Sequence, residues 1–212
     1  MKLLVMDVDS TLIDEEVIDL IGEKAGVGKE IAAITEQAMQ GKLDFQQSLT
    51  ARVKLLSNLT SDIFDEVYQE IHLTNGAREL IDEAHNRGWK VGVVSGGFHE
   101  IVDKIAADVK LDFVLANHFE LSNGKLTGKT SGQIVDSSVK LDTIKKWAAE
   151  LNLDLTDVIA IGDGANDIPM LQAAGIGIAF CAKPIVREQV KHHINERDLR
   201  KVLEIVDRGK ID

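Results

Sequence analysis

The amino-acid sequence predicts an α/β fold: a three-layer, Rossmann-like parallel sheet with a small all-helical segment inserted after the first strand. Two observations lead to this prediction. From residue 76 onward, short apolar runs alternate with stretches of helical spacing. Within residues 14–73 the apolar residues keep helical spacing, and no strand-like run interrupts them. Uniformly apolar strands are typical of parallel sheets whose two faces are both covered by helices.

These patterns divide the chain into two parts. We expect residues 1–13 and 74–212 to form an α/β catalytic core. We expect residues 14–73 to form a helical cap, called the helical insert from here on. The length of 212 residues suits one core domain with a small insert.

The individual elements follow from local signals. The run of residues 2–6 predicts the first strand, and Gly88 ends the first helix after the insert. Asn123-Gly124 is a strong turn signal for a β-hairpin. Ser137 or Ser138 is expected to cap a helix. In chain order after the insert, the sequence predicts a helix over 76–88, a strand over 89–95, a helix over 98–109, a strand over 111–117, a hairpin over 118–128, a helix over 137–152, a strand over 158–161, a helix over 165–175, a strand over 176–180, and helices over 184–192 and 198–208.

Composition limits the classes of function. A formal net charge of −11 argues against nucleic acid or an anionic membrane as a partner, because both need a basic face. The single cysteine, Cys181, permits no intrachain disulfide and no thiolate zinc site. Only four apolar residues separate Lys2 from Asp7, too few for a signal peptide. We therefore expect a cytoplasmic protein, a monomer or homodimer, that acts on a small molecule.

The first strand is followed by two acids, Asp7 and Asp9, with a single residue between them. If the strand continued to residue 9, both side chains would point to one face. Two carboxylates that close repel in a partly dry cleft, so either a cation lies between them or one of them holds a proton. A plain polar turn is the alternative explanation.

Two further strands end in unusual residues. Ser95, Gly96 and Gly97 precede a helix and could cradle an anion, although a simple cap and turn would look the same. The segment from Gly162 to Asp167 offers hard oxygen ligands that suit magnesium, although acids also favour a helix start. Ligands bind beyond the carboxyl ends of parallel strands, so all three strand ends should meet at one rim.

Two cations are also unusual in their positions. Lys140 lies in the first turn of its helix, where the helix dipole disfavours positive charge. Arg52 falls within the apolar stripe of its helix, three residues after Leu49. A buried charge needs a partner, unless the side chain extends to solvent.

The motifs DVDST and VVSGG, then Lys140 and GDGAND, resemble the haloacid dehalogenase-like superfamily of phosphohydrolases. The similarity runs nearly end to end. The segments EEVIDLIGEKAG, ITEQAMQGKLDFQQSLTARVKLL, FELSNGKLTG and GDGANDIPMLQAAGIGIAFCAKP resemble members that hydrolyse O-phospho-L-serine in the last step of serine biosynthesis. The resemblance implies a magnesium-dependent phosphatase with an aspartyl-phosphate intermediate.

The resemblance also implies a role for each matching residue. Asp7 would be the nucleophile, and Asp9 the acid that protonates the leaving serine and then activates water. Asp7, the backbone carbonyl of Asp9, and Asp163 would hold magnesium. Thr11 and Asp167 would contact these ligands without binding the metal themselves. The remaining implied roles concern the substrate: Ser95, Gly96 and Lys140 would bind the phosphoryl group with support from Asn166, Glu16 would meet the ammonium, Arg52 the carboxylate, and Met39 and Phe45 would shield the closed site.

Other functions remain open from the sequence. A phosphatase or phosphotransferase for another small phosphomonoester, such as phosphohomoserine, would share these motifs. A non-enzymatic phosphoacceptor resembling a response-regulator receiver also uses acids, a hydroxyl, a lysine and magnesium. Receivers, however, lack an acid placed like Asp9 and an insert after the first strand. A dinucleotide site is disfavoured because no G-x-G-x-x-G motif opens a helix.

Overall fold

A seven-stranded sheet runs through the middle of the computed structural model, which describes residues 1–208 apart from the side chain of Met39. The strand order is β4-β3-β2-β1-β5-β6-β7, and every neighbouring pair is parallel except β3 and β4. The strands are β1 (Leu3–Met6), β2 (Lys90–Phe98), β3 (Phe113–Ser122), β4 (Lys125–Ser131), β5 (Val158–Gly162), β6 (Ile176–Phe180) and β7 (His192–Ile194).

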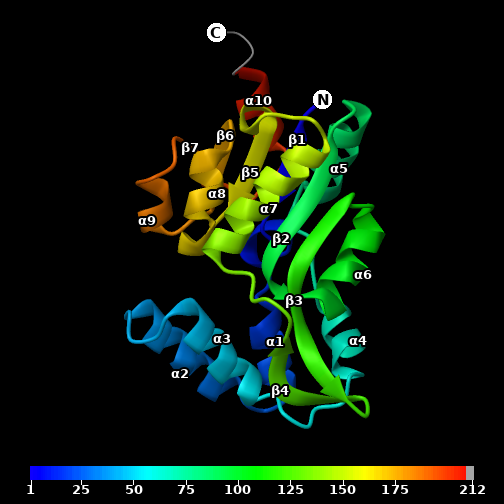
Figure 1. Cartoon of the computed structure of the whole chain (residues 1–212), viewed down its shortest axis with the longest axis vertical. Coiled ribbons are helices and arrows are strands. Elements are labelled where there is room, and N and C mark those ends of the chain that lie inside the picture. Colours follow the sequence, from blue (N-terminus) through cyan, green and yellow to red (C-terminus); the bar gives the residue numbers. More distant parts are fainter. Residues whose placement is uncertain (209–212) are drawn as a thin grey trace.

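Helices cover both faces of this sheet (Figure 1). The side chains of β1 are buried alternately on the two sides. Leu4 and Met6 join the apolar cluster that includes α5 (Ala77–Asn86), α6 (His99–Val109) and α10 (Lys201–Arg208). Leu3 and Val5 join the cluster formed with α7 (Ser137–Glu150), α8 (Ile168–Ala173) and α9 (Pro184–Arg187). The predicted three-layer fold is confirmed.

The helical insert contains α1 (Val17–Lys24), α2 (Gly28–Met39), α3 (Phe45–Lys54) and α4 (Ile63–Tyr68). These blue and cyan helices lie together at the end of the sheet where β1 stops (Figure 1). The loop between α3 and α4 pairs with the hairpin: Asn58 N donates to Leu126 O (2.8 Å) and Ser61 N to Gly124 O (2.9 Å). The insert therefore contacts the sheet through its α3–α4 loop, which binds the β3–β4 hairpin, as well as through the two chain segments that connect it to the core.

Three local predictions are corrected by the structure. The strand over 111–117 and the first hairpin strand are one continuous β3, which turns into β4 at Asn123-Gly124. The cap of α7 is Asp136, because its carboxylate accepts two backbone N–H groups, those of Ser138 and Val139, at 2.9 and 3.0 Å. The helix expected over 184–192 ends after one turn as α9, because His192–Ile194 pair with β6 instead.

Short helical turns follow two of the central strands. A π-type turn, η1 (Val8–Leu12), comes directly after β1, and a 3-10 turn, η3 (Ala165–Asp167), follows β5; a further 3-10 turn, η2 (Leu155–Asp157), precedes β5. Of the helices in the described residues, none is long and apolar enough to cross a membrane.

Candidate active site

The carboxyl end of β1 presents Asp7 and Asp9 in different conformations. Asp7 caps the turn η1, and its Oδ1 accepts a hydrogen bond from the backbone N–H of Val8 at 2.7 Å. Asp9 has φ −61° and ψ 133° inside the turn, and Ser10 follows with a left-handed φ of 57°. The strand ends at Met6, as predicted, so the condition that would place both side chains on one strand face is not met. A turn, rather than strand alternation, sets the relative position of the two acids.

Lys140 is fully buried behind Asp7. Its Nζ lies 3.0 Å from Asp7 Oδ2 and 2.7 Å from Asp167 Oδ1. Burial lowers the pKa of Lys140. The carboxylates of Asp167 and, to a smaller extent, Asp7 raise it by more than burial lowers it, so the lysine keeps its proton. The unfavourable place of Lys140 at the start of α7 is thus offset by two acids from other strand ends.

Three carboxylates meet around this lysine. Oxygen atoms of Asp7, Asp163 and Asp167 all lie within 4.8 Å of one another. The backbone N–H groups of Asp163 and Gly164 donate to Asp167 Oδ2 at 3.1 and 3.0 Å. Burial, together with Asp167, raises the pKa of Asp163 to about 6. Burial and the charge of Asp167 also raise the pKa of Asp7 well above its usual range, while Lys140 partly offsets them.

This cluster suits a divalent cation. Lys140 alone cannot balance three carboxylates held so close together, and the raised pKa values of Asp7 and Asp163 reflect that excess of negative charge. Carboxylate oxygens are ligands that hard cations prefer. Thr11 stands beside the cluster, with its Oγ1 donating to Asp163 Oδ1 at 3.3 Å. The donor set therefore fits the metal site that the sequence suggested.

Asp9 has surroundings of another kind. Burial, the charge of Glu16 and then that of Asp7 raise the pKa of Asp9 well above its usual range. Its Oδ1 is buried and has no hydrogen-bond partner among the described residues. Burial and neighbouring negative charge both favour the protonated form of a carboxyl group. The geometry thus provides a proton next to the acid that contacts Lys140.

The end of β2 forms a glycine-lined wall facing Asp9. Ser95 is fully buried, and its Oγ accepts a hydrogen bond from Gly97 N at 2.8 Å. A Cβ atom at Gly97 would lie 3.0 Å from Ser95 Oγ and 3.5 Å from Asp9 Oδ2. The strand extends past Ser95 to Phe98, and α6 begins at the next residue. Gly97 therefore leaves room for a group that approaches Asp9.

Asn117 holds this wall in place, and sequence reasoning did not single it out. Its buried side chain donates to Gly96 O and accepts from Val135 N, both at 2.8 Å. The amide thus joins the glycine segment to the loop before α7. A lone Asn in an apolar strand carries no sequence signal of such a role.

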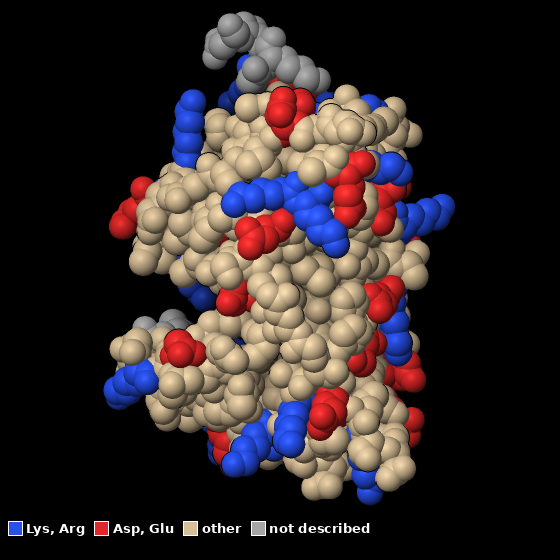
Figure 2. Space-filling model, viewed as in Figure 1, with Lys and Arg blue, Asp and Glu red and all other residues tan. Residues whose placement is uncertain are grey.

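A cavity of about 640 Å³ opens between the helical insert and these strand ends. The space-filling view shows the surface hollowed between the region of α2 and α3 and the upper part of the molecule (Figure 2). Ser95, Lys140, Asp167 and Thr11 are not part of the lining, and the side chain of Met39 lies outside the described residues. The lining includes, of the residues singled out from the sequence, Asp7, Asp9, Glu16, Phe45, Arg52, Gly96, Asp163 and Asn166.

The insert contributes one cation, Arg52, and two acids, Glu16 and Asp19, to the cavity lining. Arg52 is half-buried, and its Nε donates to Ser48 O at 3.4 Å. The negative charges of Asp19, Glu16 and Asp9 act on its guanidinium. Burial lowers the pKa of Arg52, and burial together with Glu16 raises that of Asp19. Asp19 was missed in the sequence, although its place one turn after Glu16 would have been the signal.

Lys183 is a second residue that sequence reasoning missed. It lines the cavity, and its backbone N–H donates to Asp163 O at 3.2 Å. Its side chain is exposed and adds positive charge beside the acids. The cavity lining therefore combines the acids Asp7, Asp9 and Asp163 with the cations Arg52 and Lys183.

Comparison with known proteins agrees with this geometry. A model of the haloacid dehalogenase-like hydrolase family matches residues 4–172. The chain belongs to this family. Phosphoserine phosphatase of Lactococcus lactis subsp. lactis is 64% identical over 206 residues, which cover 97% of this chain and 95% of that protein.

Solved structures of the family superpose closely on this chain. A structure described as a substrate-bound phosphoserine phosphatase complex has a TM-score of 0.91 at 45% identity, covering 96% of this chain and 97% of the other. A second, described as a phospho-aspartyl intermediate analogue of phosphoserine phosphatase, has the same TM-score and identity, with coverage of 96% and 98%. The predicted family and fold are confirmed.

Proposed function

We propose that this chain hydrolyses O-phospho-L-serine to L-serine and phosphate through an aspartyl phosphate on Asp7. The observation that carries the proposal is the placement of Asp7: it contacts buried Lys140 and lines a cavity that also contains Asp9. High identity to phosphoserine phosphatases over nearly the whole chain supports the substrate. The structural likeness to a phospho-aspartyl analogue of such an enzyme supports the intermediate.

The first half of the reaction transfers the phosphoryl group to the protein. A carboxylate oxygen of Asp7 attacks phosphorus, and the bond from phosphorus to the serine oxygen breaks. Asp9 gives its proton to that departing oxygen. A serine alkoxide is a poor leaving group, so a positioned acid contributes roughly 10²–10⁴-fold to the rate. The raised pKa of Asp9 favours the protonated form that this step needs.

The second half returns the protein to its starting state. Asp9, now a carboxylate, takes a proton from water, and the water oxygen attacks phosphorus. The bond between phosphorus and Asp7 breaks, releasing phosphate and restoring the carboxylate. Lys140, whose Nζ lies 3.0 Å from Asp7 Oδ2, would offset negative charge at the reacting group.

The acids around Lys140 would also hold a magnesium ion. We propose Asp7, Asp163 and the backbone carbonyl of Asp9 as ligands, with Asp167 and Thr11 fixing them from behind. The bound ion supplies positive charge that lets an anionic nucleophile approach a phosphate dianion. Oxygen donors alone select a hard cation, and magnesium is the one that commonly accompanies phosphoryl groups.

The helical insert, residues 14–73, acts as a cap that reads the serine part of the substrate. Glu16 meets the ammonium group and Arg52 the carboxylate, since a planar guanidinium binds a carboxylate through two hydrogen bonds. Phe45 approaches the end of β2: its Cζ would lie 3.1 Å from a Cβ added at Gly96. Phe45 would shield the reaction from water.

A phosphate-release assay over small phosphomonoesters tests this proposal. The purified chain is incubated with O-phospho-L-serine, phosphohomoserine, phosphoethanolamine or glycerol phosphate, with magnesium or with a chelator and no other alcohol acceptor. We expect phosphoserine to give the highest kcat/KM, and phosphate release to depend on magnesium. A higher kcat/KM for another ester would mean that this ester, and not phosphoserine, is the preferred substrate. Phosphate appearing only after an acceptor alcohol is added would make the chain a phosphotransferase.

A further inference from the structure

An arginine near the end of the chain contacts the point where the helical insert joins the sheet. Arg197 lies in the loop after β7. Its Nη1 donates to Ser10 O at 3.2 Å and its Nη2 to Ile13 O at 3.1 Å, while its Nε donates to the carboxylate of Asp14. Nη2 also lies 3.5 Å from Thr74 Oγ1. One guanidinium therefore binds backbone and side-chain groups on both chain segments that lead to the insert.

These two segments run side by side as a short ribbon. Ile13 and Leu73 form an antiparallel bridge. Asp14 N donates to His72 O at 3.0 Å, and Thr74 N donates to Leu12 O at 2.9 Å. Thr74 Oγ1 also donates to Asp14 Oδ1 at 3.3 Å, so the carboxylate that Arg197 holds is itself bound to the second segment.

The hydrogen bond from Arg197 to Ser10 O falls on a residue that contacts two acids of the proposed site, Asp9 and Glu16. Ser10 follows Asp9 directly and adopts a left-handed φ of 57°, which a non-glycine residue keeps only when its surroundings hold it. Its Oγ donates to Glu16 Oε1 at 2.7 Å, and its N–H donates to Glu15 O at 3.2 Å. Arg197 holds its carbonyl, so every polar group of Ser10 is bound.

We propose that Arg197 is a positioning residue: it fixes the turn at Ser10 and thereby the carboxyl groups of Asp9 and Glu16. This inference rests on the phosphatase activity proposed above. Arg197 is not among the residues that line the cavity. Its effect on the reaction passes through the backbone of Ser10.

The form of the side chain matters more than its charge. The ion pair with Asp14 is partly exposed, and exposed pairs contribute little on their own. The planar guanidinium, however, reaches two carbonyls and a carboxylate at once, which a lysine ammonium cannot do from one position. The ring of Phe180 lies 5.9 Å from the guanidinium carbon and supports it from the other side.

The test compares Arg197→Ala with the unaltered chain on two esters that lack amino and carboxylate groups, ethyl phosphate and p-nitrophenyl phosphate. Departure of ethoxide needs the proton of Asp9, whereas nitrophenolate leaves without it. The ratio kcat/KM reports the steps up to loss of the leaving group. We expect it to fall about 10- to 100-fold on ethyl phosphate, the size expected of a displaced catalytic group, and by distinctly less on p-nitrophenyl phosphate.

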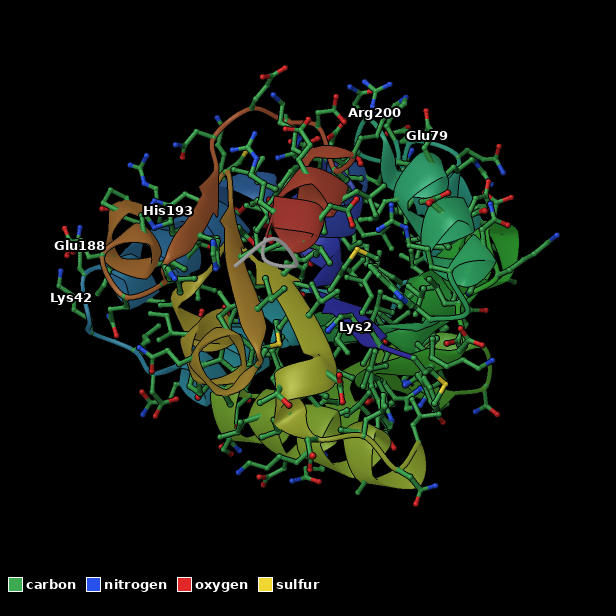
Figure 3. All side chains as sticks on the ribbon, turned by 90° about the horizontal axis from the view of Figure 1, so that it is seen from above. Lys2, Lys42, Glu79, Glu188, His193 and Arg200 are labelled. Carbon is green, nitrogen blue, oxygen red and sulfur yellow. The ribbon has the colours of Figure 1, made fainter. Side chains whose placement is uncertain are left out.

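Arg200→Ala is the matched control. Arg200 belongs to the same loop, but its guanidinium binds Asp198, two residues away, and lies at the rim of the molecule beside Glu79 (Figure 3). We expect this variant to match the unaltered chain on both esters. Circular dichroism and thermal unfolding of each variant show whether it is folded under the assay conditions.

Equal losses on the two esters, or no loss on either, by folded Arg197→Ala would overturn the inference. Should that variant fail to fold, Arg197→Lys takes its place: it keeps the charge, and we expect a smaller change in the same direction, whereas an unchanged ratio of the two esters would overturn the inference. If the unaltered chain releases no phosphate from any ester, the proposed function itself falls. If the unaltered chain is active but the Arg197 variant has the same ratio of kcat/KM on the two esters, only the role of Arg197 is removed.

Discussion

Asp7 and Asp9 are only two residues apart, yet their contacts differ. Asp7 meets the ammonium of Lys140, whereas Asp9 has an oxygen without a hydrogen-bond partner among the described residues and faces the charge of Glu16. Burial raises the pKa of both acids, but the ammonium of Lys140 and the metal ion proposed beside it favour the carboxylate form of Asp7, whereas Glu16 and Asp7 favour the protonated form of Asp9. This difference suits one acid to attack phosphorus and the other to carry a proton.

Arg52 permits a test of substrate recognition at the level of one side chain. Arg52→Ala should raise the KM for O-phospho-L-serine about 10- to 100-fold, because a hydrogen bond to a charged group contributes roughly 1.5–3 kcal/mol. The KM for a phosphate ester without a carboxylate should change little. Steady-state phosphate release with both esters measures the difference.

Lys54→Ala provides the control for this variant. Lys54 is an exposed cation two residues later in α3, so its removal changes the net charge equally without touching the cavity. Equal losses on the two esters for Arg52→Ala would mean that Arg52 does not read the carboxylate.

At the scale of helices and strands, the sequence signals that succeeded were local. Apolar runs such as Leu3–Met6 are buried on both faces, and Asn123-Gly124 makes the expected turn with φ of 51° and 74°. The errors arose where neighbours in space decide. His192–Ile194 pair with β6, and this pairing cannot be read from a segment that also has helical spacing. Asp136 precedes two serines that are equally good caps by residue type.

The candidate site divides in the same way. The residues at strand ends, such as Asp7 and Asp163, could be selected because parallel strands bring their carboxyl ends together. Asn117 and Arg197 could not, because each acts by binding the backbone of a segment distant in sequence. Only the folded chain brings these partners within hydrogen-bond distance.

Asp112 links three elements and gives a prediction about stability and pH. It lies just before β3, where it accepts hydrogen bonds from Lys90 Nζ (2.6 Å) and Val91 N (2.9 Å) and meets His85 Nε2 at 3.0 Å. Partial burial raises the pKa of Asp112, but these hydrogen bonds together hold it below the ordinary value of 3.8. A lowered pKa in the folded state means that the carboxylate stabilises the fold above pH 3.8, and that this contribution is lost as pH falls further.

We therefore expect Asp112→Asn to lower the free energy of unfolding by about 1–2 kcal/mol at neutral pH. The difference from the unaltered chain should narrow below pH 3.8. Urea unfolding at several pH values measures it. Asp82→Asn, which removes an exposed carboxylate from α5, should change stability little at any of these pH values. A difference for Asp112→Asn that stays constant into acid would contradict the assignment.

At the scale of the whole molecule, charge is distributed unevenly. Acidic and basic side chains are interspersed on the face shown in Figure 2. The chain as a whole is strongly acidic, yet Arg52 and Lys183 line a single cavity, and buried Lys140 contacts Asp7 of the same lining. Local positive charge within an acidic protein is enough to receive a small anion. The predicted cytoplasmic location and the monomeric or dimeric state stay predictions.

Magnesium should stabilise the whole fold, because a ligand that binds only the folded state raises its stability. At a concentration about 100 times its Kd the gain is about 2.7 kcal/mol, or roughly 5–10 °C in Tm for a chain of this size. Thermal unfolding with magnesium or chelator measures this without reference to activity. Asp163→Asn should lose most of the rise, whereas Asp142→Asn, at an exposed position of α7, should keep it. An undiminished rise in Asp163→Asn would remove Asp163 from the metal site.

The central claim is that Asp7 receives the phosphoryl group of phosphoserine. Its most direct test is the release of serine and phosphate from O-phospho-L-serine by the unaltered chain and by Asp7→Asn, with magnesium present and the folding of both checked by circular dichroism. We predict equal amounts of serine and phosphate from the unaltered chain and a loss of roughly 10³-fold or more in the variant. Substantial turnover by folded Asp7→Asn would contradict the account.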